Sequence, residues 1–271
     1  MPTFRIAAID LVLDGKGADL PGGWGDLEAF RGPAAESVPG FRLDWRCAAG
    51  LPNPGLKGDA TFEDLPDGVV AFRRADFEGR VDPALGRGVL ETAPSIGAVR
   101  SALRFVASLA LLERDGFLLH SAGLVESGSA YLLFGPSGAG KSTAAGLSRP
   151  RILLSDELCA LRRTDVGWQA YGTPFAGSLG EPGGTGEAPV GAVAFLEKAE
   201  AVSTRALAAA EMVPLLYPQV FRPSRSAGRP ARWLALAAAL AASVPCLALR
   251  FRRDPSFWDA LLKVRAQGRA A

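Results

Sequence analysis

The chain has 271 residues, of which 48% are hydrophobic and 21% are charged, and its formal net charge is +2. This composition is typical of folded globular proteins and excludes an intrinsically disordered chain. Because the charge is nearly balanced, the sequence gives no argument for a nucleic acid or a membrane surface as a partner. The length allows one large domain or two smaller ones, each with its own core.

The first 95 residues are predicted to be rich in strands. Residues 4–13 form one apolar run, and residues 41–47 alternate apolar with charged side chains, which is the period of a half-buried strand. Further short strand candidates are residues 61–62, 69–72 and 88–90. Glycine and proline separate these runs, so we expect a small antiparallel sheet that carries no catalytic pattern and makes no nucleotide contact.

The apolar period changes after residue 95. Residues 95–113 repeat apolar side chains at helical spacing. Buried strands are then expected at residues 117–120, 130–134, 152–154 and 192–196, with a helix after Lys141. This alternation of strands and helices favours an α/β layer in the second part of the chain.

Loops and three further elements are expected toward the C-terminus. Residues 177–191 are rich in glycine and proline and predict a loop, and a helix over residues 206–213 should end at Pro214. Residues 221–232 are predicted to form a mobile basic loop, whose arginines are Arg222, Arg225, Arg229 and Arg232. The end is expected to contain a helix, a strand at residues 246–251 and a helix at residues 255–263.

The clearest motif is a phosphate-binding loop of the pattern Gly, four residues, Gly-Lys-Ser, placed between an apolar strand and a helix. Its glycines let several amide N–H groups point at phosphates, and the helix N-terminus adds its positive end. Lys141 is expected to reach the β and γ phosphates of ATP or GTP, and Ser142 to bind Mg²⁺, because a hard cation prefers oxygen. The expected nucleotide-binding residues are Gly135, Pro136, Ser137, Gly138, Ala139, Gly140, Lys141, Ser142 and Thr143.

Two carboxylates, Asp156 and Glu157, follow the apolar run of residues 152–155. In a parallel sheet, ligand groups lie at the C-terminal ends of strands, so both are expected beside the phosphate-binding loop. One carboxylate is needed to hold Mg²⁺, directly or through water, and the other could accept a proton from a hydroxyl nucleophile. Ser142 and Asp156 are the expected metal ligands, and Asp156 is also the base expected for a kinase.

His120 is the only histidine of the chain. It ends the strand predicted at residues 117–120, where a histidine at the edge of the core is commonly bound by backbone groups. The sequence alone therefore leaves open whether His120 belongs to the core or to the site.

Three features together resemble the HPr kinase/phosphorylase family and its P-loop kinase-like relatives. They are Leu119-His120 before the loop, Gly-x-Ser-Gly-x-Gly-Lys-Ser at residues 135–142, and Ser155-Asp156-Glu157 after the next strand. The resemblance covers residues 105–175 and implies the fold class α/β, with an HPr kinase-like P-loop domain over residues 96–271 preceded by a small strand-rich domain over residues 1–95.

The same resemblance implies roles for individual residues. Asp156 would deprotonate a target serine, Glu157 would be the second carboxylate, and His120 would lie near the phosphates. The expected catalytic residues are therefore Asp156, Glu157, His120 and Lys141. The chain departs from the HPr enzyme at Thr143 and Glu157, where the family has Glu and Asp, and it has no copy of the downstream signature loop.

Two functions stay open at this point. The first is a kinase that transfers the γ-phosphoryl group of ATP to a Ser, Thr or small-molecule hydroxyl, with an arginine of residues 222–232 covering the transferring group. The second is a non-catalytic or regulatory nucleotide-binding module that recognises a peptide or protein. Residues 192–198 resemble uncharacterised relatives, several of which accompany peptide-modifying gene clusters, so a peptide acceptor is among the candidates.

The remaining features favour a cytoplasmic protein. Residues 1–14 lack the pattern of a signal peptide, and the apolar run of residues 233–249 is shorter than the roughly 20 residues of a membrane span. The three cysteines form neither a zinc pattern nor a paired framework, and reduced thiols are expected at Cys47, Cys159 and Cys246. A homo-oligomer is compatible with this sequence.

Overall fold

The computed structural model describes residues 1–15, 20–32, 40–52, 59–180, 183–226 and 228–268. It has mixed α/β structure with two sheets. The chain divides into two compact units, the first made of residues 1–114 with 222–230 and the second of residues 115–221 with 231–271. The first unit therefore contains more than the 1–95 region expected from the sequence, and it takes in a segment from late in the chain.

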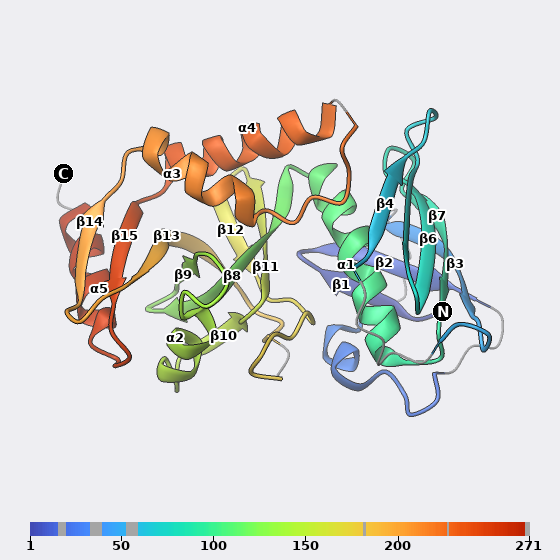
Figure 1. Ribbon diagram of the computed structural model, residues 1–271, viewed down its shortest axis with the longest axis horizontal. Helices are drawn as coiled ribbons and strands as arrows, with labels where there is room; N and C mark the ends of the chain where they lie inside the picture. Colours follow the sequence, from blue (N-terminus) through green and yellow to red (C-terminus); the bar gives the residue numbers. More distant parts are fainter. Residues whose placement is uncertain (16–19, 33–39, 53–58, 181–182, 227, 269–271) are drawn as a thin grey trace. The chain divides into compact units, whose positions relative to one another are not determined.

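The first unit is built on a seven-stranded sheet of order β1-β2-β3-β7-β6-β5-β4. Its strands are β1 (Thr3–Ile6), β2 (Ile9–Asp14), β3 (Phe41–Cys47), β4 (Thr61–Asp64), β5 (Val70–Arg74), β6 (Phe77–Asp82) and β7 (Arg87–Thr92). A short 3₁₀ helix, η1 (Gly25–Phe30), joins β2 to β3. Helix α1 (Ile96–Leu112) packs against β2, β6 and β7 (Figure 1). Ser95 starts this helix by accepting a hydrogen bond from the amide of Ala98 at 3.1 Å, as is usual at an N-cap.

The sheet of the first unit is mixed, so the expectation of an antiparallel sheet is wrong. The pairs β2–β3 and β3–β7 are parallel, whereas the remaining pairs are antiparallel. A parallel pair requires a long crossover connection. The chain provides one between β2 and β3, which includes η1, and another through β4, β5 and β6 between β3 and β7.

The apolar run of residues 4–13 forms a hairpin and not the single strand that its pattern predicts. Ala7 and Ala8 have φ values of 51° and 58°, and they reverse the chain between β1 and β2. Two successive residues with positive φ form the tight turn that matches the twist of a hairpin. Alanine seldom takes that conformation, so the composition of this turn gave no signal.

The second unit is built on an eight-stranded sheet of order β10-β8-β11-β12-β13-β15-β14, in which β9 pairs with both β13 and β8. Its strands are β8 (Gly116–Glu126), β9 (Ser129–Phe134), β10 (Ile152–Ser155), β11 (Leu158–Thr164), β12 (Gly167–Tyr171), β13 (Glu187–Lys198), β14 (Ser203–Ala206) and β15 (Cys246–Phe251). Its helices are α2 (Lys141–Leu147), α3 (Ala209–Leu216), the 3₁₀ helix η2 (Tyr217–Gln219), α4 (Gly228–Ser243) and α5 (Phe257–Gly268).

Strand directions in this sheet bring four strand ends to one edge. Strand β9 is parallel to β13, and β13 is parallel to β15. Strand β8 is antiparallel to both β9 and β10, so β10 also runs in the direction of β9. The C-terminal ends of β9, β10, β13 and β15 therefore lie at the same edge, although β10 has no parallel neighbour in the described part of the sheet.

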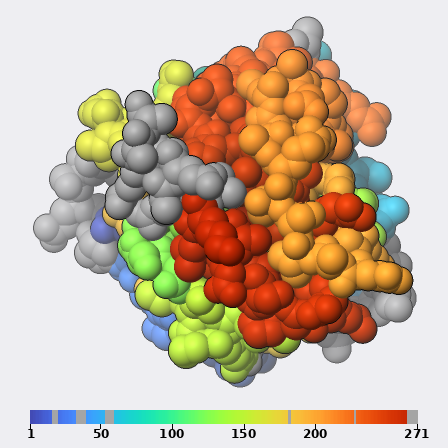
Figure 2. Space-filling view, turned by 90° about the vertical axis from the view of Figure 1, so that its left-hand side faces the viewer, coloured from blue at the N-terminus to red at the C-terminus, as the bar shows by residue number. Residues whose placement is uncertain are grey.

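Helices cover both faces of this sheet. Helices α2 and α5 share an apolar cluster with β8, β9, β13 and β15, and Figure 1 draws α2 below the sheet and α3 and α4 above it. The indole of Trp258 in α5 donates a hydrogen bond to the hydroxyl of Ser148 at the end of α2, at 3.0 Å. Figure 2 views the face on which the orange residues of β14 and α3 lie beside the red residues of β15 and α5. No helix among the described residues is both long enough and apolar enough to span a membrane.

Several predicted elements in this unit have other bounds in the structure. Residues 187–191, expected in a loop, belong to β13, where Gly191 forms a bulge and a Cβ there would lie 2.9 Å from that of Ser129. Helix α3 begins at Ala209 and not at residue 206, which ends β14, and it continues past Pro214 to Leu216. Pro214 has no amide N–H to donate to the carbonyl of Ala210. Both residues are exposed, so water can donate a hydrogen bond to that carbonyl instead.

The predicted mobile loop at residues 221–232 is also wrong in part. From Gly228 onward the chain is helical, with Arg229 and Arg232 in α4. Pro230 does not prevent this, because the amides of the first helical turn need no partner within the helix. Arg222 and Arg225 precede the helix in irregular structure.

Asp64 at the end of β4 holds this segment in the first unit. Its carboxylate accepts hydrogen bonds from the Ser224 hydroxyl, from the amides of Arg225 and Ser226 at 2.6 and 2.7 Å, and from Arg229 Nη1 at 2.9 Å. Burial would raise the pKa of Asp64, but these hydrogen bonds and the Arg229 charge outweigh burial and lower it.

We expect Asp64→Ala to weaken the attachment of residues 224–229 to the end of β4 by about 2 kcal/mol, because several hydrogen bonds to one charged group are lost together. Hydrogen exchange at the amides of Arg225 and Ser226 should accelerate, while the matched change Glu63→Ala on the same strand should leave it unaltered. Since the pKa of Asp64 is lowered, the contact should also weaken in the wild type as the pH falls below about 4. Unchanged exchange in the Asp64 variant would contradict this account.

Candidate functional site

The phosphate-binding loop joins β9 to α2 at the edge where the four strands end. Gly138 and Gly140 have φ values of 76° and 110°, a region that favours glycine. A Cβ at Gly140 would also lie 3.0 Å from the ring of Phe251. The local sequence therefore allows the backbone to curl tightly before Lys141 begins the helix.

Lys141 lies partly buried against the loop. Its ammonium group donates hydrogen bonds to the carbonyls of Gly135 and Pro136, at 2.8 and 3.2 Å. Burial lowers the pKa of Lys141, and the nearby charge of Glu157 acts in the opposite direction. This geometry places a cation at the loop, together with the positive end of α2.

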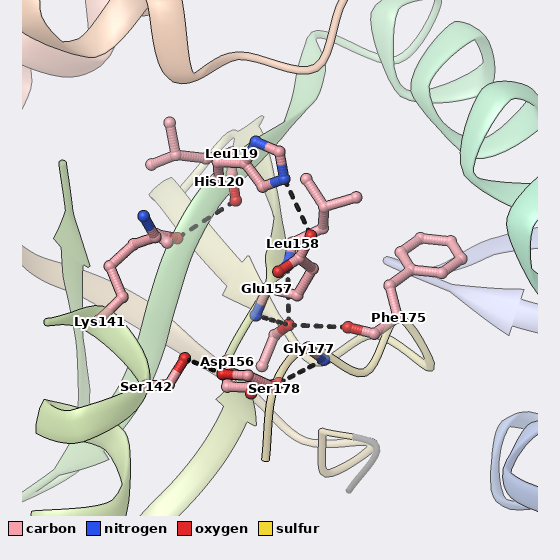
Figure 3. A network of polar contacts seen from close by, with 12 residues as sticks. Leu119, His120, Lys141, Ser142, Asp156, Glu157, Leu158, Phe175, Gly177 and Ser178 are labelled. Atoms are coloured by element: carbon pink, nitrogen blue, oxygen red, sulfur yellow. Dashed lines mark hydrogen bonds and ion pairs between the residues drawn. The ribbon is translucent and has the colours of Figure 1, made fainter. Parts of the chain in front are cut away.

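Asp156 is buried, with 1% of its surface exposed, and it organises a neighbouring loop. Its two carboxylate oxygens accept hydrogen bonds from the amides of Gly177 and Leu179, at 2.7 and 2.9 Å. Between those residues, the Ser178 hydroxyl donates a hydrogen bond to Ser142 at 2.6 Å. Asp156 thus positions Ser178 beside Ser142, the expected metal ligand, as Figure 3 shows.

Glu157 and His120 form a second pair of polar side chains. Glu157 Oε1 lies 3.1 Å from His120 Nε2, and Figure 3 shows the two side chains pointing toward one another. The pairing of β8 with β11 sets Leu158 opposite His120 and so brings Glu157 to it. The Glu157 side chain is 31% exposed, which leaves it accessible to a ligand.

The phosphate-binding loop and the two carboxylates line one cleft of about 920 Å³ in the second unit. This volume is in the usual range of small-molecule sites. It is lined by Ser137 to Thr143, Asp156 and Glu157, all of which the sequence analysis named. His120 and the first two residues of the loop, Gly135 and Pro136, are not among the lining residues. His120 reaches the site through Glu157.

Sequence reasoning missed seven residues that also line the cleft: Ser178, Lys198, Ala199, Glu200, Phe251, Arg252 and Arg253. Six of them follow or end β13 and β15, two strands whose existence the sequence did predict. The rule that ligand groups gather at strand ends could have found these six, had it been applied to every predicted strand. Ser178 lies in the loop bound by Asp156 and gives no such signal.

The comparisons with known proteins found similar solved structures but no matching family and no matching curated protein. No protein-family model matches the chain, and no curated protein matches it. The HPr(Ser) kinase/phosphatase from Coxiella burnetii is a similar solved structure, with a TM-score of 0.37 and 13% sequence identity over 57% of this chain and 99% of that chain. A likeness of this size assigns neither a function nor a residue role to this chain.

The donor atoms at the loop suit a magnesium ion that is shared with phosphates. Ser142 and Asp156 offer hydroxyl and carboxylate oxygens, the type of ligand that Mg²⁺ prefers. Within the described residues, no three His, Cys, Asp or Glu side chains gather into a metal site.

Proposed function

We propose that the chain is an ATP-dependent kinase that transfers the γ-phosphoryl group to a hydroxyl acceptor. The observation that carries the proposal is the single cleft that contains a complete phosphate-binding loop and two carboxylates, Asp156 and Glu157. Phosphoryl transfer requires mainly positioning and charge stabilisation, and these groups supply both. GTP is the alternative nucleotide, because the loop contacts only phosphates.

In this proposal the residues of the loop hold the nucleotide. The amides of residues 137–142 and the Lys141 ammonium bind the phosphate oxygens, and the negative charge is stabilised by Lys141 and the N-terminus of α2. Ser142 and Asp156 hold Mg²⁺, which would neutralise charge on the β and γ phosphates. Ser178 supports Ser142 through its 2.6 Å hydrogen bond.

We assign acceptance of the proton to Glu157, although the family resemblance gives that role to Asp156. The carboxylate of Asp156 is buried and both of its oxygens accept amide hydrogen bonds, so it suits anchoring and metal binding better. Glu157 is accessible and its partner His120 fixes its orientation. A general base must reach the proton that it removes, which favours the accessible carboxylate.

The acceptor belongs to the class of hydroxyl compounds, with a Ser or Thr of a peptide or protein and a small molecule as the candidates. The competing function is a regulatory module that binds nucleotide without transferring phosphate. The presence of an accessible carboxylate in addition to the phosphate-binding loop favours the kinase, because nucleotide binding alone does not require a base.

The proposal is tested by titration calorimetry with MgATP and by transfer of labelled γ-phosphate. Binding of MgATP together with label in a covalent product, identified by mass spectrometry of a peptide mixture or a metabolite mixture, is the expected result. Binding without transfer to any hydroxyl acceptor would support the regulatory module. Failure of both MgATP and MgGTP to bind at millimolar concentration would refute both functions.

A further inference from the structure

The cleft includes residues outside the phosphate-binding loop. They are Lys198, Ala199 and Glu200 at the end of β13, and Phe251, Arg252 and Arg253 at the end of β15. The ring of Phe251 lies against Gly140, so the end of β15 directly adjoins the loop. None of these residues has a role in the proposed phosphate chemistry.

The order of the strands decides which part of a nucleotide this region would meet. The two carboxylates follow β10, which is separated from β9 by β8 on one side of the loop. Strands β13 and β15 lie on the other side of β9. Because the reacting phosphate must face the carboxylates, the nucleoside is directed toward the ends of β13 and β15.

The side chains at those ends have the chemistry of a nucleoside site. Arg252 forms an ion pair with Asp254, whereas no carboxylate in the described parts of the chain pairs with the exposed Arg253. A guanidinium group is planar and stacks on aromatic rings. Glu200 is exposed after the end of β13 and also lines the cleft. A carboxylate there can accept hydrogen bonds from ribose hydroxyls, as acidic residues do in other nucleotide sites.

We infer that the ends of β13 and β15 form the nucleoside subsite, in which Arg253 covers the base and Glu200 binds the ribose hydroxyls. This inference rests on the proposed function. It adds a nucleoside requirement to a site whose phosphate-binding loop alone would accept any triphosphate.

The role of Arg253 is tested with two ligands that differ only in the nucleoside, MgATP and magnesium tripolyphosphate. In titration calorimetry, Arg253→Ala is expected to weaken MgATP binding by roughly 10-fold and to leave tripolyphosphate binding unchanged. The matched control is Arg250→Ala, because Arg250 is exposed on β15 but does not line the cleft. An equal loss for both ligands would mean that Arg253 binds phosphate and would overturn the inference, as would no loss for either.

The role of Glu200 is tested with ATP and 2′,3′-dideoxy-ATP. The wild type should prefer ATP by roughly 10-fold, which is the size expected for hydrogen bonds to a charged group. Glu200→Gln should reduce that preference, whereas Glu197→Gln, at an exposed residue of β13 outside the cleft, should preserve it. A preference that persists in the Glu200 variant would overturn the ribose contact.

The same titrations separate the two proposals. A wild type that binds both MgATP and tripolyphosphate with equal affinity refutes the nucleoside subsite and leaves the phosphate-binding loop in place. A wild type that binds neither ligand refutes the proposed function and the subsite together.

Discussion

Replacement of Lys141 by alanine is expected to lower phosphoryl transfer at least about 10²–10³-fold, the usual cost of losing one preorganised group that stabilises charge in a transition state. The effect should be large because Lys141 is partly buried at the loop, where water cannot fully replace its charge. Transfer is measured with γ-labelled ATP, and circular dichroism checks that the variant is folded.

Lys263→Ala is the matched control, since Lys263 is an exposed lysine of α5 that does not line the cleft. It should retain wild-type transfer. Near-normal transfer by the Lys141 variant would show that the reacting phosphates do not lie at this loop.

Glu157→Gln is expected to reduce transfer about 10²–10⁴-fold with little change in MgATP affinity, because it removes the proposed base and keeps the shape of the side chain.

Asp156→Asn should behave differently. An amide side chain has one oxygen acceptor, so it cannot keep both hydrogen bonds to the amides of Gly177 and Leu179. That variant should lose MgATP affinity as well as transfer.

Hydrogen exchange at Gly177 and Leu179 separates the roles of the two carboxylates. At least one of the two amides should lose protection in the Asp156 variant, and both should retain it in the Glu157 variant. If Glu157→Gln keeps normal transfer, and Asp156→Asn abolishes transfer with both amides still protected, then Asp156 is the base, as the family resemblance implies.

Local sequence pattern was sufficient to predict elements whose signal lies within a single strand, helix or loop. The alternation of residues 41–47 gave β3 with its bounds, the helical period after Ser95 gave α1, and the spacing of glycines and lysine gave the loop before α2. In each case the signal lies within about 20 residues, and burial follows the periodicity of the strand or helix.

Pairing between distant segments could not be derived in this way. The contact of His120 with Glu157 depends on the register of β8 against β11, which no property of either segment reveals. Likewise, the bulge at Gly191 depends on the close approach of Ser129. The sequence therefore named the loop and the two carboxylates that line the cleft, and the sheet decided which other residues lie beside them.

The binding of residues 222–230 by Asp64 has a consequence for biosynthesis. The carboxylate of Asp64 and the hydroxyl of Ser224 are separated by 160 positions in the chain. A ribosome therefore releases every strand of the N-terminal sheet long before it supplies the last piece of that unit, and contacts between such distant residues form slowly. Because each unit consists of two separate stretches of the chain, truncating the gene at one position cannot produce a complete unit. A plasmid for the N-terminal unit alone has to encode residues 222–230 after residue 114, joined by a linker.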